Sequence, residues 1–102
     1  GFNVFSAEVE NAINGHAAVE NCAVVGTPDE KWGEMVTAIV VLRPNQSVTV
    51  EELIAFTKER IGSVKAPKNI EFWDDMPRSA VGKILKNEIR KTFWEGSERA
   101  VN

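Results

Sequence analysis

The sequence has few of the features that mark secreted, disulfide-stabilised or membrane-spanning proteins. Cys22 is the only cysteine, so no disulfide can form within the chain. No apolar run approaches the roughly 20 residues that a helix needs to cross a bilayer. No basic segment followed by an apolar one resembles a secretory leader. We therefore expect a cytoplasmic protein without a membrane span.

Basic residues are scarce in the first half of the chain and concentrated in the second. Residues 58–91 hold nine lysines and arginines against five acidic residues, a net charge of +4, whereas residues 1–57 carry −6. The basic segment suits an anionic partner such as phosphate, although a solvated lysine-rich surface has the same composition. We expect no nucleic-acid partner, because the pI is about 5.2 and the basic residues are not interleaved with aromatic ones.

The length of 102 residues predicts a single domain, of which 43% is hydrophobic. Its apolar periodicity and turn residues predict an α+β fold, a small mixed sheet covered by helices, in the order α-β-β-α-β-α. The expected helices cover residues 7–14, 50–61 and 85–93, and the expected strands cover 22–25, 35–42 and 70–73.

Local signals set the expected ends of these elements. Thr49 and Glu52 have the spacing of a capping box, and Gly62 is placed to stop the helix that follows. Ser6 is the expected N-cap of the first helix. Residues 26–29, Gly-Thr-Pro-Asp, form a turn signal after the first strand, and residues 95–102 lack clear periodicity.

The segment from Pro77 to Lys86 is the most informative for chemistry. Lys83 follows Gly82 in a loop just before a helix, so its ammonium can reach a phosphate or carboxylate on another surface. A Walker A loop is excluded, because it needs an earlier glycine and a Ser or Thr after the lysine, where Pro77 and Ile84 stand. A Gly-Lys pair taken alone is an ordinary exposed turn.

Five segments in order resemble the C-terminal domain of the adenylate-forming superfamily, which includes acyl-CoA synthetases, peptide-synthetase adenylation domains and luciferases. The matching segments are residues 1–10, 23–34, 36–42, 64–68 and 77–90. The acyl-CoA synthetase branch fits better than the peptide-synthetase branch, whose terminal motif reads Asn-Gly-Lys followed by Asp-Arg. The chain's ending also resembles that of bacterial medium- or long-chain fatty-acid ligases.

The resemblance implies a part of a larger enzyme. Residues 1–102 would be the mobile C-terminal domain, and an N-terminal domain, absent here, would bind ATP, the carboxylic acid and Mg²⁺. The acid and ATP would form an acyl-adenylate, which CoA would then attack. Lys83 would be the adenylation lysine, placed between the acid's carboxylate and the α-phosphate. The small domain would rotate between the two steps and present a different face in each.

Other residues acquire expected roles from the same resemblance. Gly1 and Asn3 would lie in a loop that lines the CoA tunnel after rotation, and Lys58 would meet a CoA phosphate. Weaker candidates for that phosphate are Arg60, Lys65 and Lys68. No metal site is expected in this chain. Lys83 also stands in a motif resembling the site at which protein acetyltransferases modify bacterial acyl-CoA synthetases, so an acetyltransferase and a deacetylase are expected partners.

Three conspicuous residues are expected to be structural. His16 follows a helix end and suits a cap or a surface position better than a catalytic base. Cys22 is expected to be a small buried residue, and Trp32 is expected to pack. The alternative reading of the whole chain is a stand-alone α+β module that senses an anionic ligand, which predicts ligand binding by the isolated 102 residues.

Overall fold

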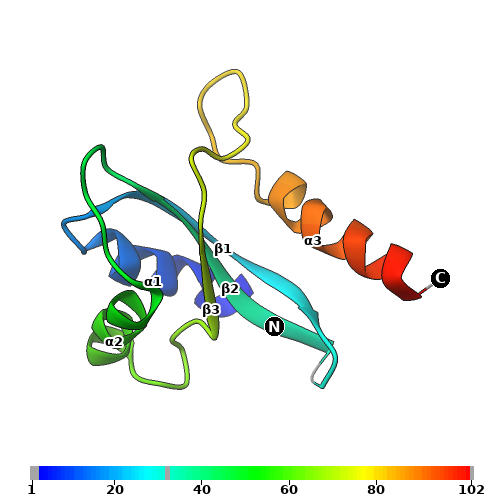
Figure 1. Cartoon of the computed structure of the whole chain (residues 1–102), viewed down its shortest axis with the longest axis horizontal. Helices are drawn as coiled ribbons and strands as arrows, with labels where there is room; N and C mark the ends of the chain where they lie inside the picture. Colours follow the sequence, from blue (N-terminus) through cyan, green and yellow to red (C-terminus); the bar gives the residue numbers. More distant parts are fainter. Residues whose placement is uncertain (1–2, 32, 102) are drawn as a thin grey trace.

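We describe the chain from a computed structural model that covers the backbone of residues 3–31 and 33–101 and the side chains of residues 6–31 and 33–95. Three helices and three strands follow the predicted order (Figure 1). Their bounds are α1 Asn3–Asn14, β1 Val19–Asp29, β2 Gly33–Leu42, α2 Val50–Ile61, β3 Asn69–Phe72 and α3 Lys86–Val101. The α+β prediction is confirmed.

The sheet is mixed and has helices on both faces. Its strand order is β1-β2-β3, with β1 antiparallel and β3 parallel to the central strand β2. Successive side chains of a strand point to opposite faces. Val24 of β1 therefore packs in one apolar cluster with α1 and α2, whereas its neighbour Val25 packs in a second cluster with Ile89 of α3. The result is three layers, with α1 and α2 on one face and α3 on the other (Figure 1).

The predicted ends of α2 are confirmed. Thr49 is the N-cap, and its Oγ1 accepts a hydrogen bond from the backbone N–H of Glu52 at 3.0 Å. Gly62 closes the helix with φ 84°, and its N–H donates to the carbonyl of Lys58 at 2.8 Å. Because these contacts join residues three and four apart, they could be predicted from sequence alone.

The turn predicted at residues 26–29 is wrong, because β1 continues to Asp29. Pro28 lies opposite Glu34 in the antiparallel pair with β2. A proline cannot donate to a central ladder, but it is tolerated in an edge strand, where one side has no strand partner. β1 is the edge strand of this sheet, which explains why Pro28 does not end it.

Two helices are longer than predicted. α1 begins at Asn3, so Asn3 lies in the first turn of the helix instead of a preceding loop, and Ser6 is not the N-cap. Nothing between these residues breaks a helix, which lets α1 extend past the Ser6 signal. α3 continues to Val101 because no proline interrupts it, and Gly96 costs a helix only about 1 kcal/mol relative to alanine.

Two sequence predictions concern residues outside the described part of the chain, namely the role of Gly1 in the CoA tunnel and the packing of Trp32. Within the described residues, no helix combines the length and the apolarity that a transmembrane segment requires.

Candidate functional site around Lys83

Lys83 stands at the end of a three-residue hairpin loop. The N–H of Gly82 donates to the carbonyl of Ser79 at 2.9 Å, and the N–H of Ser79 donates to the carbonyl of Lys83 at 2.8 Å. Gly82 has φ 87°, the left-handed conformation that glycine adopts without a steric cost. Two such bonds around a left-handed glycine are the pattern of a three-residue hairpin loop. The Gly-Lys sequence is therefore a defined turn with one conformation.

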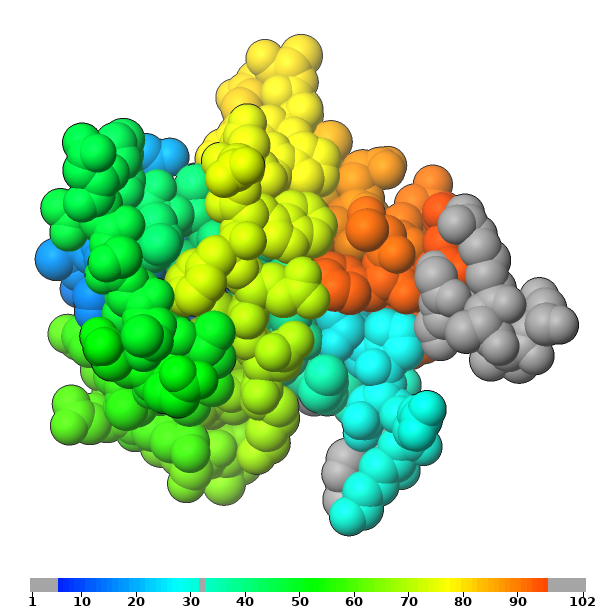
Figure 2. Space-filling model, in the orientation of Figure 1, coloured from blue at the N-terminus to red at the C-terminus, as the bar shows by residue number. Residues whose placement is uncertain are grey.

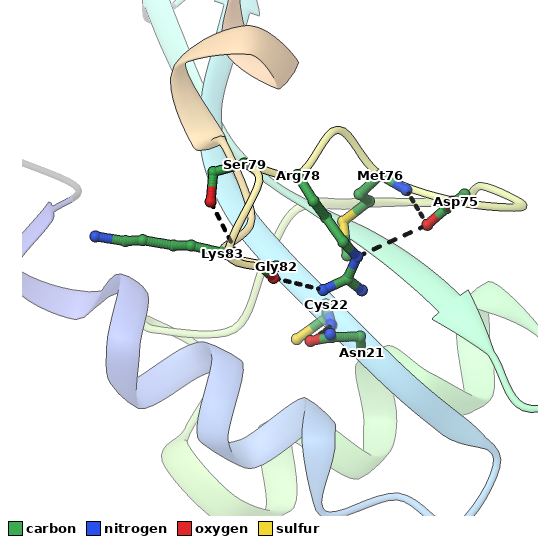
Figure 3. Close-up of polar contacts among 8 residues, drawn as sticks. All are labelled: Asn21, Cys22, Asp75, Met76, Arg78, Ser79, Gly82 and Lys83. Atoms are coloured by element: carbon green, nitrogen blue, oxygen red, sulfur yellow. Dashed lines mark hydrogen bonds and ion pairs between the residues drawn. The ribbon is translucent and has the colours of Figure 1, made fainter.

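Ser79 holds both backbone groups of Lys83. Its Oγ accepts from the N–H of Lys83 at 3.2 Å, in addition to the bond between its own N–H and the Lys83 carbonyl. The lysine side chain extends away from this turn, as Figure 3 shows. It is exposed, and no described group forms a hydrogen bond or an ion pair with its Nζ. The backbone is thus fixed while the charge remains available to an external anion.

The opposite side of the turn is held by Arg78. Its guanidinium donates to the carbonyl of Gly82 at 3.2 Å and lies 3.9 Å from the carboxylate of Asp75 (Figure 3). The same carboxylate accepts the N–H of Met76 at 2.8 Å. Arg78 thus contacts the turn from the side opposite to Ser79.

The base of the hairpin is joined to the core. The N–H of Leu85 donates to the carbonyl of Pro77 at 2.9 Å, and Met76 is 4% exposed in the apolar cluster under α3. Ile84 packs against the same cluster. The tip is different, because Val81 is 91% exposed. Figures 1 and 2 show this yellow-to-orange segment projecting beyond the body of the molecule.

An open groove of about 530 Å³ runs along the segment after the turn, lined by residues 83–88. It contains two lysines, Lys83 and Lys86, and one acid, Glu88. Lys86 is paired, since its Nζ lies 2.6 Å from the carboxylate of Glu10, whereas Lys83 has no ion pair with any side chain that the structure describes. The arrangement can place one unpaired ammonium against a phosphate or carboxylate brought by another surface.

The structure does not bring Lys58 next to Lys83. Lys58 is exposed in the last turn of α2, which lies on a different side of the molecule from the hairpin (Figure 1). The weaker candidates differ in accessibility. The Arg60 guanidinium lies over the Phe56 ring at 4.3 Å, and Lys65 pairs with Glu8 at 3.1 Å. Lys68 is exposed.

His16 and Cys22 have the structural positions that the sequence predicts. Nδ1 of His16 accepts the N–H of Ala18 at 3.0 Å, and its ring meets the edge of Phe56. Cys22 is 4% exposed. Burial raises the pKa of its thiol to about 12, the Glu10 carboxylate adds to the rise, and the Lys86 ammonium opposes it. A neutral buried thiol is a poor nucleophile.

Sequence reasoning named Lys83 as a candidate site residue but did not name the residues that hold its backbone. Ser79 and Arg78 could have been found from the spacing, since a glycine three residues after Ser79 suits a three-residue hairpin loop. The partner of Lys86 could not, because Glu10 lies near the other end of the chain. No group of three or more His, Cys, Asp or Glu side chains among the described residues could hold a metal ion.

Comparison with known proteins identifies relatives of this chain. The sequence model of the AMP-binding enzyme C-terminal domain matches residues 8–83, so the match ends on Lys83. The medium/long-chain-fatty-acid–CoA ligase FadD8 of Mycobacterium tuberculosis is 48% identical over 99% of this chain and 19% of its own length. The fatty acid–[acyl-carrier-protein] ligase ScoC of Streptomyces coeruleorubidus is 46% identical over 100% of this chain and 20% of its own.

Solved structures share the fold. The acyl-CoA synthetase of Brucella canis superposes with a TM-score of 0.84 at 35% identity, over 90% of this chain and 18% of that one. A Mycobacterium tuberculosis fatty acyl CoA synthetase superposes with a TM-score of 0.80 at 40% identity, over 86% of this chain and 17% of that one. The present chain thus spans about a fifth of the length of the curated relatives that it matches. By sequence and by fold, the chain belongs to the family of AMP-binding enzyme C-terminal domains.

Proposed function

We propose that the chain is the mobile C-terminal domain of an ATP-dependent, AMP-forming acid–CoA ligase, and that Lys83 is its adenylation lysine. The observation that carries this proposal is the hairpin, which fixes the backbone of Lys83 and leaves its ammonium exposed and unpaired among the described residues. An N-terminal domain outside this chain would bind ATP and the acid. The names of the FadD8 and ScoC relatives favour a fatty acid as substrate.

The chemistry of adenylation explains the need for a lysine on a projecting loop. The acid's carboxylate attacks the α-phosphorus of ATP, so two anionic groups must approach each other, and pyrophosphate leaves. An ammonium between the carboxylate oxygen and the α-phosphate offsets this repulsion and stabilises the charge of the transition state. Because the hairpin projects beyond the body of the domain, Lys83 can enter a site formed by the other domain (Figure 2).

In the second step, the CoA thiolate would attack the acyl carbonyl and release AMP. Lys83 would have to leave and another face of the domain would have to enter, which is a rigid-body rotation. We place Gly1 and Asn3 beside the pantetheine tunnel and Lys58 at a CoA phosphate in this orientation. The position of Lys58 on α2, on a different side from the hairpin, is compatible with a separate face for each step (Figure 1).

Several further expectations concern the whole protein. ATP and CoA are the proposed co-substrates, and Mg²⁺ would be held by the N-terminal domain together with the ATP phosphates. A cytoplasmic location remains a prediction, which fractionation of cells that express the full protein would test.

Lys83 is also the proposed site of control by acetylation. An acetyl group removes the charge of the lysine, so the modified side chain could not offset the repulsion between carboxylate and phosphate. A purified protein acetyltransferase should modify Lys83 in the full-length protein, as read by mass spectrometry, and a deacetylase should restore adenylation. Failure to modify Lys83 would remove this part of the proposal.

The direct test is Lys83→Ala in the full-length protein. Pyrophosphate exchange should fall by a factor on the order of 10²–10³, the loss typical of removing one charge-stabilising donor. Thioester formation from supplied acyl-adenylate should persist, because Lys83 faces away in that step. Lys91→Ala is the matched control, since Lys91 is also an exposed lysine and lies on α3.

Normal pyrophosphate exchange by Lys83→Ala would overturn the proposal. Supplying CoA and an acyl carrier protein in parallel would identify the thiol acceptor, since the relatives include both kinds of ligase. If Lys58 binds a CoA phosphate, Lys58→Ala should raise the KM for CoA and leave pyrophosphate exchange unchanged.

A further inference from the structure

The outer edge of β1 is covered by side chains from other elements. Backbone groups on that edge have no strand partner, and an uncovered edge leaves them unsatisfied or open to other chains. The Glu10 carboxylate of α1 accepts the N–H of Val24 at 2.8 Å, and the indole N–H of Trp94 in α3 donates to the carbonyl of Gly26 at 2.9 Å. One helix from each face of the sheet, α1 and α3, is therefore hydrogen-bonded to this edge.

The Glu10 carboxylate has a second partner, which connects it to the hairpin. The oxygen that accepts from Val24 also lies 2.6 Å from Nζ of Lys86. The Glu10 side chain is 17% exposed and that of Lys86 is 42% exposed. Short contacts between an ammonium and a carboxylate are stronger than neutral hydrogen bonds, and partial burial reduces their screening by salt.

Lys86 is the first residue of α3 and comes three residues after Lys83. Ile84 and Met76 bury the base of the hairpin through apolar contacts, which are non-directional. The Lys83 side chain makes no ion pair with the described residues that could hold it. The ion pair with Glu10 ties the start of α3, three residues after Lys83, to one atom that is itself hydrogen-bonded to β1.

We propose that Glu10 is a positioning residue for Lys83. Fixed by the backbone of β1, it holds Lys86 and thereby the orientation of the hairpin that presents Lys83 to the acid and ATP. This inference rests on the proposed adenylation function. It assigns no contact with substrate to Glu10, which acts only through Lys86.

The test uses the full-length protein and the variant Glu10→Gln. The amide oxygen can still accept from Val24, so the edge of β1 stays covered while the ion pair is lost. We expect kcat for pyrophosphate exchange to fall roughly tenfold, since misplacing a catalytic group by about 1 Å can cost up to 10²-fold. The KM for ATP and thioester formation from supplied acyl-adenylate should change less than twofold, whereas general destabilisation would reduce both half-reactions.

The matched control is Glu8→Gln. It removes the same charge from the same helix and breaks another ion pair, Glu8 with Lys65 at 3.1 Å, which does not involve the hairpin. This variant should retain normal exchange. Equal losses in Glu8→Gln and Glu10→Gln would overturn the proposal, because the effect would then come from charge or from α1 stability.

Variants of Lys86 separate positioning from direct contact. Lys86→Arg should keep most of the exchange activity, and Lys86→Met should lose about as much as Glu10→Gln. The double variant Glu10→Gln/Lys86→Met should be no slower than the slower single variant, because both remove one ion pair. If Lys86→Met is slow while Glu10→Gln is normal, Lys86 acts on the substrate directly and the proposal fails.

Lys83→Ala belongs in the same series. If it abolishes exchange while Glu10→Gln does not reduce it, the positioning role fails and the proposed function stands. If Lys83→Ala has normal exchange, the proposed function fails, and the role of Glu10 fails with it.

Discussion

At the scale of single residues, the site depends on backbone conformation as much as on charge. Lys83 can project because Gly82 has φ 87° and because Ser79 pairs with both backbone groups of the lysine. An added Cβ at Gly82 would have no atom within 4 Å, so only the left-handed backbone disfavours a larger residue there. The turn is therefore sensitive to a substitution that causes no steric clash with neighbours.

We expect Gly82→Ala in the full-length protein to reduce pyrophosphate exchange roughly tenfold while destabilising the fold by only about 1–2 kcal/mol. The control is Gly62→Ala, which also has open space and a positive φ of 84°, at the end of α2. Gly62→Ala should destabilise the fold at least as much as Gly82→Ala does and should leave pyrophosphate exchange normal. Chemical denaturation and exchange assays on both variants check this, and parallel losses of exchange would contradict it.

At the scale of elements, polar contacts between α3 and the sheet meet at one glycine, Gly26. The carbonyl of Gly26 accepts the Trp94 indole N–H, and the Glu34 side chain crosses over Gly26 to reach Arg90 of α3 at 3.0 Å. The Arg90 guanidinium also lies over the Trp94 ring at 4.9 Å. A Cβ at position 26 would overlap the Glu34 carboxylate, so glycine permits this crossing.

The effect of Gly26→Ala on the free energy of unfolding should therefore depend on whether residue 34 is glutamate. In the otherwise native chain the Glu34 side chain must move away, and the partly exposed ion pair with Arg90, worth under about 1 kcal/mol, is lost. In a Glu34→Ala background the side chain atoms closest to the new Cβ are gone, and Gly26→Ala should raise the free energy of unfolding by roughly 0.5–1 kcal/mol, since alanine suits a strand better than glycine. Urea denaturation of the native protein, the two single variants and the double variant measures the coupling between Gly26→Ala and Glu34→Ala. Additive changes in the free energy of unfolding would contradict the prediction.

At the scale of the whole molecule, the domain presents charged groups without enclosing a ligand. The groove beside Lys83 is open, and Lys58 is exposed on another side. Exposed ion pairs contribute only about 0–1 kcal/mol, and small-molecule sites usually bury most of the ligand surface. Two solvent-facing lysines on separate sides should therefore bind anions weakly in the isolated chain.

We expect the isolated 102-residue chain to bind ATP and CoA with dissociation constants no tighter than about 1 mM, equivalent to roughly 4 kcal/mol. It should form no detectable acyl-adenylate. Calorimetric titration and a pyrophosphate-release assay check both expectations. Saturable micromolar binding of an anion by the isolated chain would favour the stand-alone sensing module instead.

The features that depend on neighbouring residues could be predicted from the amino-acid types alone. Thr49 and Glu52 predicted the start of α2, Gly62 its end, and the Gly82-Lys83 pair the loop that carries the candidate catalytic charge. Each of these rests on hydrogen bonds or torsion angles within about four residues, so the residue types alone specify them.

The features that depend on distant residues could not be predicted, because they arise when the helices and strands pack together. β1 runs through Pro28 because it became the edge strand, and Glu10 meets Lys86 because α1 and the start of α3 are both packed against β1. Propensity describes one residue and its close neighbours. Which strand lies at an edge, and which opposite charges meet, follows only when burial of both faces of the sheet sets the whole arrangement.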